Sequence, residues 1–269
     1  MITSYQQIID LASGSDRTVK LAIAGKPNSE LQSALDKAVA QNMIEPVVFE
    51  TAEEATKAVS SDKCDMLMKG SVDTKDFMRA VLDKEFGLRT GSLISHTLVV
   101  EALNRMIMIT DAGICMEPDL RQKAEIIKNA VPIAQKLGIE EPKVAVLAAV
   151  EKVNPKMPET VDAKALSEMD FEGCQVQGPL AVDNAISEEA AQTKGITGAV
   201  AGKADILVCP SVVAGNMFAK GIMYFSDSKF GGIVAGTSKP VIFLSRSDSC
   251  ETKFNTIALG VVLCFADQK

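Results

Sequence analysis

The sequence has very little of the chemistry on which metal hydrolases and disulfide-stabilised proteins depend. Its 269 residues include one histidine, His96, and no tryptophan. A single imidazole argues against a zinc or di-metal hydrolase that uses several histidine ligands, and we expect no metal site. The six cysteines form no C-x-x-C pair. This spacing is typical of reduced thiols in a cytosol, so we expect a cytoplasmic protein without disulfides.

The chain also lacks a surplus of basic residues and a long hydrophobic run. It has 35 acidic and 28 basic residues, which gives a net charge of −7. This balance argues against a nucleic-acid or membrane-surface partner, so an anionic ligand must be attracted by a local basic cluster. The uncharged stretch at residues 256–266 is too short to span a bilayer. No basic segment followed by an apolar run opens the sequence, so we expect no signal peptide.

Strands and helices alternate in the first third of the chain. Apolar runs at residues 19–24, 46–49 and 65–68 predict strands, and the segments between them have the spacing of amphipathic helices. This rhythm predicts an α/β fold with a parallel sheet covered by helices. Ligands of such sheets bind beyond the carboxyl ends of the strands. Lys69, which follows the third strand, is therefore a candidate anion ligand.

The rhythm changes near residue 90, where we predict a domain boundary. Two strands, 93–100 and 105–110, follow one another without a convincing helix between them. Further along, residues 119–137 predict a long helix, residues 143–150 a strand, and residues 174–176 a weak strand. We interpret residues 178–187 as a loop that enters a helix. The final helix, from residue 249, is apolar on nearly every face and is therefore expected to be buried.

The segment at residues 236–252 combines a short strand, a hydroxyl-rich turn and the start of this last helix. Residues 240–244 predict a buried strand, and Ser245 and Ser247 flank Arg246 in the turn. We expect Asp248 to cap the helix, with Glu251 three residues later forming a capping box. One interpretation is a tight, well-capped turn. The other is an anion site, because free N–H groups, the helix dipole and a guanidinium all favour phosphate or a developing oxyanion.

Several strings resemble the phosphate acetyl/butyryl-transferase family, in the family's order and over most of the chain from about residue 65. They are K-G at 69–70, G-L-R-T-G at 87–91, I-T-D-A at 109–112, E-K-V-N-P-K-M-P at 151–158, G-P-L-A-V-D-N-A-I-S at 178–187, A-G-N at 214–216 and S-R-S-D-S at 245–249. The form of the 151–158, 183–187 and 245–249 strings is more similar to the butyryl branch than to the acetyl branch.

The resemblance implies reversible acyl transfer, in which acyl-CoA and phosphate give acyl phosphate and CoA. It also implies an isocitrate/isopropylmalate dehydrogenase-like fold with parallel-rich sheets and an interdomain cleft. Residues 1–90 and 233–269 would form the first α/β domain and residues 91–232 the second. Family members are usually homodimers, and CoA is a substrate rather than a tightly bound cofactor. Neither a nicotinamide nor an obligatory divalent metal belongs to this chemistry.

Read with the resemblance, the turn at 245–248 holds the candidate catalytic residues. Arg246 would bind phosphate or acyl phosphate, and Ser245 would donate to the carbonyl or the leaving group; an ion pair and a backbone-bonded hydroxyl are the structural alternatives. Asp248 is a candidate base for the CoA thiol. As a helix cap, however, its carboxylate would be stabilised as the anion, which opposes the proton affinity that a base needs. Its role therefore stays open between base and cap.

The remaining candidates are binding residues, each with a structural alternative. Lys69, Arg79 and Arg89 could hold phosphate or the phosphates of CoA, although Arg79 on a helix could equally lie on a solvated face. Gly236 opens the 236–252 segment. His96 is interpreted as a structural histidine more readily than as a base. Asp183 and Asn184 would shape the cleft or the acyl pocket, and Asn216 would contact CoA or start its helix.

Two departures from the family pattern leave other functions open. The family usually reads P-D-I-E-A-G-N where this chain has P-S-V-V-A-G-N, so acidic residues are missing at Ser211 and Val213. That loss could shift the acyl preference, or it could mark a non-catalytic CoA-binding homologue. A phosphate acetyltransferase and a decarboxylating dehydrogenase of the sister fold are further alternatives, although the dehydrogenase would need an aspartate cluster for a metal. Cys250, near the helix start, is interpreted as packed or modifiable rather than catalytic.

Overall fold

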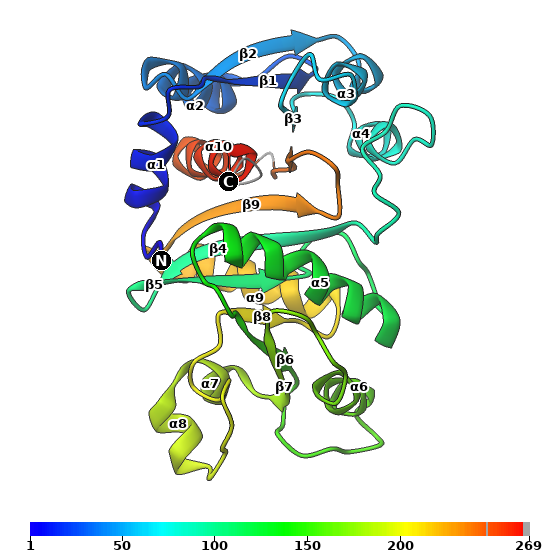
Figure 1. Cartoon of the computed structure of the whole chain (residues 1–269), viewed down its shortest axis with the longest axis vertical. Coiled ribbons are helices and arrows are strands. Elements are labelled where there is room, and N and C mark those ends of the chain that lie inside the picture. The colour runs from blue at the N-terminus through cyan, green and yellow to red at the C-terminus, as the bar shows by residue number, and fades with distance from the viewer. Residues whose placement is uncertain (246, 266–269) are drawn as a thin grey trace. The chain divides into compact units, whose positions relative to one another are not determined.

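The computed structural model describes residues 1–245 and 247–265 and divides the chain into two compact units. Unit 1 contains Met1–Thr3 and Leu93–Ser228, and unit 2 contains Ser4–Ser92 and Lys229–Lys269. Unit 2 is therefore built from two segments that are distant in the sequence (Figure 1). The predicted first domain comprises residues 1–90 and 233–269, and the predicted second domain comprises residues 91–232. The division into compact units does not show that these domains fold or move separately, so the domain assignment stays a prediction.

Unit 2 is built on a mostly parallel sheet. Its strands are β1 (Val19–Ala24), β2 (Ile44–Phe49), β3 (Met66–Lys69), β9 (Lys229–Ala235) and β10 (Val241–Ile242), in the order β2-β1-β3-β10-β9. The pairs β2–β1, β1–β3 and β3–β10 are parallel, whereas β9 and β10 are antiparallel. The buried β-branched, leucine and methionine side chains of β1 and β3 explain why these segments form interior strands.

Five helices belong to unit 2: α1 (Tyr5–Ser13), α2 (Ser29–Ala40), α3 (Ala52–Ser60), α4 (Thr74–Val81) and α10 (Cys250–Phe265). The last of them, α10, contacts β9, α1 and α2, and it lies among these elements in Figure 1. From Lys253 to Leu263 every residue of α10 is buried. This confirms that the helix with apolar residues on nearly every face is a core helix.

Unit 1 contains the other five strands of the described residues. Its strands are β4 (Ser95–Ala102), β5 (Arg105–Thr110), β6 (Lys143–Leu147), β7 (Gln175–Leu180) and β8 (Ile206–Val208), in the order β4-β5-β8-β6-β7. Its helices are α5 (Leu120–Lys136), α6 (Pro158–Ser167), α7 (Val182–Ile186), α8 (Glu188–Thr193) and α9 (Val212–Phe225). The pairs β5–β8, β8–β6 and β6–β7 are parallel. The predicted parallel-rich sheets flanked by helices are confirmed.

Two local features explain where the rhythm of the chain changes. Strands β4 and β5 form an antiparallel hairpin, and its turn places Leu103 and Asn104 at φ values of 52° and 57°. Both positive values are those of a tight hairpin turn. The predicted loop at residues 178–187 is partly wrong, because β7 continues to Leu180. Pro179 is tolerated there because, among the described strands, β7 is an edge strand that pairs only with β6.

Candidate functional site

Three parallel strands of unit 2 bring predicted site residues to one edge of the sheet. Ala24 of β1 pairs with Lys69 of β3, and Ile242 of β10 pairs with Met68. Lys69 and Ser245 therefore leave the carboxyl edge of the same sheet from neighbouring strands. Lys69 is half-buried, and its Nζ lies 3.4 Å from the main-chain oxygen of Gly70. This edge is where ligands of parallel α/β sheets bind.

Glycine is required where the loops after β1 and β3 meet. Gly25 has a φ of 81°, and its N–H donates to the main-chain oxygen of Phe49 at 2.8 Å. The Gly70 N–H donates to the Ala24 oxygen at 2.9 Å. A Cβ on Gly70 would lie 2.5 Å from the Gly25 main-chain oxygen, far inside van der Waals contact. The K-G pair at 69–70 thus places the lysine beside a tightly packed loop crossing.

The turn after β10 is closed by its own polar groups. The Ser245 N–H donates to Asp248 Oδ2 at 2.9 Å, and the Asp248 N–H donates to the Ser245 oxygen at 3.2 Å. The hydroxyls of Ser245 and Ser247 are 3.0 Å apart, and the Ser245 side chain is exposed. Arg246, the predicted phosphate ligand, lies outside the described residues. The structure therefore joins Ser245 and Asp248 in one turn at the sheet edge.

The predicted cap of α10 is wrong by one residue. The helix begins at Cys250, and the Ser249 hydroxyl accepts a hydrogen bond from the Thr252 N–H at 3.1 Å. Ser249 therefore caps the helix, and the capping box predicted between Asp248 and Glu251 does not form. The Asp248 carboxylate instead turns back to the Ser245 N–H. Asp248 therefore holds a main-chain donor of the turn rather than the cap of α10, and its role as a base stays a prediction.

Arg89 and Gly236 lie together, at the other end of β10. Arg89 forms an isolated antiparallel bridge with Thr237, and Thr90 Oγ1 donates to the Gly236 oxygen at 2.9 Å. Gly236 has a φ of 85°, which favours glycine. This turn joins the antiparallel strands β9 and β10. The turn therefore precedes β10, whereas Ser245 follows β10. Arg89 is exposed on this turn rather than at the edge that carries Ser245.

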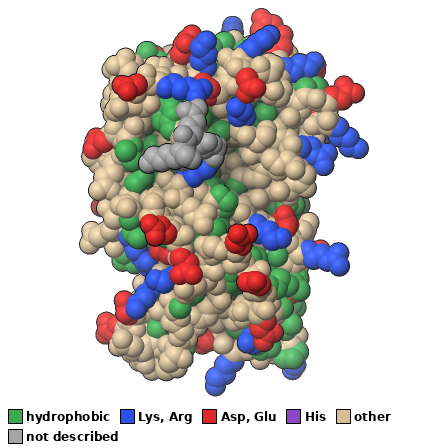
Figure 2. Space-filling model, in the orientation of Figure 1, with side chains coloured by type: hydrophobic (Ala, Val, Ile, Leu, Met, Phe, Trp, Pro, Cys, Tyr) green, Lys and Arg blue, Asp and Glu red, His purple; other side chains and the backbone are tan. Residues whose placement is uncertain are grey.

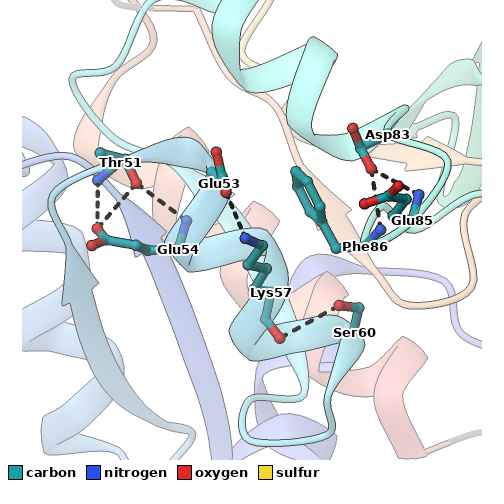
Figure 3. Close-up of polar contacts among 8 residues, drawn as sticks. All are labelled: Thr51, Glu53, Glu54, Lys57, Ser60, Asp83, Glu85 and Phe86. Atoms are coloured by element: carbon teal, nitrogen blue, oxygen red, sulfur yellow. Dashed lines mark hydrogen bonds and ion pairs between the residues drawn. The ribbon is translucent and has the colours of Figure 1, made fainter.

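The loop that leads to Arg89 is fixed to helix α3. Figure 3 shows the Asp83 carboxylate accepting from the N–H groups of Glu85 at 2.8 Å and Phe86 at 3.1 Å. The Phe86 ring faces Lys57, whose Nζ lies 4.7 Å from the ring centroid. A hydrogen bond to Glu53 raises the pKa of Lys57. The contact between Phe86 and Lys57 therefore holds the loop before Arg89 against α3.

Arg79 lies on an exposed face of a helix, which is the structural alternative to phosphate binding. It occupies the last turn of α4, and its side chain is 68% exposed. Its Nη1 pairs with Asp76 Oδ1 at 3.1 Å, three residues earlier on the same helix. Among the described residues, no hydrogen bond or ion pair directs this guanidinium toward Ser245, so phosphate binding by Arg79 stays a prediction.

Asp111 organises the second group of predicted residues, in unit 1. Its carboxylate is buried at the end of β5 and accepts from three N–H groups: His96 at 2.8 Å, Gly113 at 2.6 Å and Ile114 at 2.7 Å. Asn216 Nδ2 donates to the adjacent Ala112 oxygen at 3.2 Å. The sequence shows Asp111 only as part of the I-T-D-A string. Its position directly after a strand was the one signal of this organising role.

The contacts of His96 and Asn216 are structural. The main-chain oxygen of His96 accepts a hydrogen bond from Thr110 Oγ1 at 3.1 Å. The His96 ring packs over Gly113, and a Cβ added to Gly113 would lie 3.4 Å from the Cγ of His96. Asn216 is on the first turns of α9 and joins that helix to residue 112. These contacts fit the interpretation of His96 as a structural histidine. They leave ligand contacts of either residue as predictions.

Asp183 and Asn184 belong to a charged network around Lys194. Lys194 Nζ lies 2.7 Å from Glu151 Oε1 and 2.9 Å from Asp183 Oδ2, and the buried Asn184 Nδ2 donates to Glu151 Oε1 at 2.5 Å. The hydrogen bond from Lys194 lowers the pKa of both Glu151 and Asp183. The same contacts, Glu151 first, raise the pKa of Lys194. The network connects the 151–158 loop to α7 and to the end of α8. The sequence did not identify Lys194 as part of this network.

The cysteines are free thiols, of which Cys64 and Cys209 are buried. All six are free, and burial raises the pKa of Cys115 and of Cys209 to about 12. Within residues 1–245 and 247–265, no group of three histidine, cysteine or carboxylate side chains could hold a metal ion. On the face shown in Figure 2, acidic and basic side chains are interspersed rather than gathered in a basic stripe. In the part of the chain that the structure describes, no helix is long and apolar enough to cross a membrane.

Comparison with known proteins identifies the family. The sequence pattern of the family described as Phosphate acetyl/butaryl transferase matches residues 28–261. The chain belongs to this family. The phosphate butyryltransferase of Clostridium acetobutylicum is 50% identical to it over 225 residues, which are 81% of this chain and 75% of that protein.

Solved structures agree with this assignment to the Phosphate acetyl/butaryl transferase family. A branched-chain phosphotransacylase from Enterococcus faecalis V583 has a TM-score of 0.83 at 33% identity and covers 91% of this chain and 99% of its own. A protein assigned as a 4-hydroxythreonine-4-phosphate dehydrogenase from Salmonella typhimurium has a TM-score of 0.51 at 12% identity and covers 92% of this chain and 100% of its own. The second likeness concerns the fold alone. The predicted isocitrate/isopropylmalate dehydrogenase-like α/β fold is confirmed.

The two departures from the pattern of this phosphate acetyl/butaryl transferase family differ in structure. Ser211 caps α9, because its hydroxyl accepts from the Ala214 N–H at 3.3 Å. Serine can therefore fill the capping position that the family's aspartate would take. Val213 is 63% exposed on the first turn of α9 and replaces a carboxylate with an apolar surface. Of the two, Val213 changes the chemistry of the surface.

Proposed function

We propose that this protein is a phosphate acyltransferase that moves a butyryl or branched short-chain acyl group reversibly between CoA and phosphate. The observation that carries the proposal is the 50% identity to phosphate butyryltransferase over 81% of the chain. The likeness to a branched-chain phosphotransacylase, at 33% identity, adds support. CoA acts as a substrate in this reaction, and we propose no tightly bound cofactor or metal.

The reaction exchanges one bond at the acyl carbon for another. A phosphate oxygen attacks the thioester carbonyl carbon, the C–O bond forms, and the C–S bond breaks. The CoA thiolate leaves with the electron pair of that bond and takes up a proton. In the reverse direction the thiol loses its proton and its sulfur attacks the acyl phosphate. Both directions need donors at the carbonyl oxygen, cations at phosphate and a proton acceptor for the thiol.

Ser245 is the proposed donor to the carbonyl oxygen. Its hydroxyl is exposed at the carboxyl edge of the unit 2 sheet, and its main chain is held by Asp248. Donors that are fixed before the reaction stabilise developing charge without reorganising. Lys69 from the neighbouring strand and Arg246 from the turn are the proposed phosphate ligands, with the first turn of α10 adding its dipole.

Asp248 is the proposed proton acceptor for the CoA thiol. A thiol has a reference pKa of about 8.5, so its attack on acyl phosphate is assisted by a positioned carboxylate. The carboxylate accepts from the Ser245 N–H at 2.9 Å, which fixes its position beside the proposed oxyanion donor. The Thr252 N–H in the first turn of α10 donates to the Ser249 hydroxyl instead of to Asp248.

The other predicted residues take supporting roles in this proposal. Arg79 and Arg89 are proposed to meet the phosphates of CoA, and Gly236 shapes the turn that presents Arg89. The unit 1 residues His96, Asp183, Asn184 and Asn216 are proposed to bind the acyl group or CoA. Their contacts with Asp111, Glu151 and Ala112 support a role in shaping loops rather than in proton transfer.

The test is a thiol-release assay with butyryl-CoA and phosphate. We expect thiol release that requires phosphate and falls by at least about 100-fold in Ser245→Ala, since removing one oxyanion donor costs about that much. Arg246→Ala should raise the KM for phosphate. A matched control is Ser247→Ala, which removes the neighbouring hydroxyl in the same turn. Release that does not depend on phosphate would contradict the proposal.

A second candidate is a non-catalytic CoA-binding homologue, and the observation that favours it is Val213. An exposed valine stands where the family usually has a carboxylate. Val213→Glu restores that charge. If the wild-type protein binds CoA but turns over neither acetyl-CoA nor butyryl-CoA, this candidate replaces the first. Faster turnover of acetyl-CoA than of butyryl-CoA would instead favour a phosphate acetyltransferase.

We further propose a cytoplasmic homodimer whose interface includes α9. This helix buries only Gly215 and Ala219, whereas Val213, Met217, Tyr224 and Phe225 are exposed. Large exposed apolar patches on a protein commonly mark interaction surfaces. Gly221, on the same stripe, has no atom within 4 Å of the position of a Cβ. Glycine lowers the stability of a helix, and no packing contact of Gly221 with the described residues of the chain requires it. A glycine at this position would let a second helix approach closely.

A further inference from the structure

Lys253 is a buried cation in the first turn of α10. Its residue is 4% exposed, and its Nζ donates a hydrogen bond to the main-chain oxygen of Asp248. Its own N–H donates to the Ser249 oxygen at 3.0 Å. None of the ion pairs among the described residues includes it. Within residues 1–245 and 247–265, its ammonium is therefore held by a carbonyl and not by a carboxylate.

This is an unfavourable place for a positive charge. The first turn of a helix is the positive end of its dipole, where cations are destabilising. Burying an ammonium without a counter-ion costs further free energy. A methionine of similar length would fill the same space without either cost. Stability of the helix therefore does not explain a lysine at this position.

The contacts of Lys253 lead directly to the proposed catalytic residues. Its ammonium holds the Asp248 oxygen, the Asp248 carboxylate holds the Ser245 N–H, and the Asp248 N–H holds the Ser245 oxygen. The turn at 245–248 is thus fixed at its far end to the body of α10. We expect that loss of the ammonium would leave the Asp248 peptide less firmly held and would weaken the bond from the Ser245 N–H to its carboxylate.

We propose that Lys253 is a positioning residue for acyl transfer. It orients Asp248, and through Asp248 it orients Ser245 against the reacting carbonyl. The inference rests on the proposed function for its kinetic part. Misplacing a reacting group by about 1 Å costs on the order of 100-fold in rate, so a modest movement of this turn has a large kinetic effect.

Lys253→Met tests the proposal, with Lys37→Met as the matched control. Lys37 also packs on α10, with its Nζ 4.0 Å from the ring centroid of Phe254, but it is exposed, and no hydrogen bond or ion pair joins it to the described residues of the turn. In Lys253→Met we expect kcat to fall about 10- to 100-fold, with the KM for acyl-CoA within about threefold of wild type. Lys37→Met should keep kcat within about twofold. Lys253→Arg, which keeps the charge and its donors, should recover part of the loss.

A double-mutant cycle separates positioning from a general loss of stability. If Lys253 acts through Asp248, then Lys253→Met should cost far less in an Asp248→Ala background than in the wild type. Independent, multiplicative losses would overturn the proposal. If Lys253→Met does not fold, Lys253→Gln serves in the same cycle, since it keeps a donor and removes the charge.

Amide hydrogen exchange tests the structural part without any activity. The peptide that covers residues 243–250 should exchange faster in Lys253→Met than in wild type or in Lys37→Met, because its turn has lost its anchor. Unchanged exchange overturns the inference whether or not the wild-type protein turns over. Faster exchange with unchanged kcat also overturns it. Absence of thiol release in the wild type, with faster exchange in the variant, overturns the proposed function and leaves the anchoring role supported.

Discussion

Asp111 is the residue on which the loops at the end of β5 depend. Its buried carboxylate accepts three main-chain N–H groups, and these belong to β4 and to the loop that follows β5. A carboxylate satisfies several donors at once, which no apolar side chain of similar size can do. This explains an acidic residue in the interior of unit 1.

Asp111→Ala is expected to lower the free energy of unfolding by about 3 kcal/mol or more. Each buried N–H that loses its acceptor costs roughly 1–3 kcal/mol, and three are affected. Urea denaturation followed by circular dichroism measures the change. Asp111→Asn keeps one carbonyl acceptor and should lose clearly less. Equal losses in the two variants would show that hydrogen bonding is not the cause.

Lys194 should govern part of the stability of unit 1 in acid. Because it lowers the pKa of Glu151 and Asp183, the stabilisation is present above the unfolded pKa values of about 4 and is lost as the pH falls through the lowered values. We expect Lys194→Met to flatten this acid-side loss. Thermal melts from pH 6 to pH 3 test it. Because Lys194 and Asp183 are exposed and Glu151 is only half-buried, added salt should reduce the difference, and an unchanged pH profile would contradict the prediction.

The residue scale also limits what the sequence could predict of the site. Ser245, Lys69 and Asp248 follow strands or sit in the predicted turn, and the structure brings them to one sheet edge. Lys253 and Lys194 gave no such signal, because their roles arise from partners that the fold brings to them. A lysine on a helix is normally solvated, and only the buried position of Lys253 distinguishes it.

At the scale of the element, the start of α10 shows why caps are harder to predict than helices. Asp248 and Ser249 are both favoured capping residues, and local pattern does not separate them. The tertiary contact decides, because the Asp248 carboxylate binds the Ser245 N–H and leaves Ser249 to cap. The strands β1 and β5 were predicted to the residue, since their apolar runs end at clear turn signals. Strand β7 was underestimated, because proline weakens the pattern without preventing an edge strand.

The capping assignment gives a prediction for stability. Ser249→Ala should lower the free energy of unfolding by about 1 kcal/mol, because the Thr252 N–H loses its acceptor. Glu251→Ala is the control and should change it much less, since the predicted capping box does not form. Chemical denaturation of both variants measures the effect. A larger loss for Glu251→Ala than for Ser249→Ala would contradict the structure of this turn.

At the scale of the whole molecule, the exposed face of α9 predicts an assembly. Met217 is 71% exposed, and Phe225 is 93% exposed. Met217→Glu places a like charge on both copies of a symmetric contact, so we expect it to yield monomers. Light scattering coupled to gel filtration measures the mass. Leu11→Glu, at an exposed leucine of α1, is the control and should leave the mass unchanged. A wild-type monomer would contradict the proposed dimer.

The two-segment construction of unit 2 has a consequence for how the chain emerges during synthesis. The ribosome releases β1, β2 and β3 first, then residues 93–228 of unit 1, and only afterwards β9, β10 and α10. Until then one side of β3 has no neighbour and the surface that α10 covers is bare, a state that exposes nascent chains to aggregation. Unit 1 can close earlier, because almost all of it is continuous in sequence. A chain halted after residue 228 would therefore join a complete unit to an unfinished one, and such a chain is a natural client for chaperones and proteases.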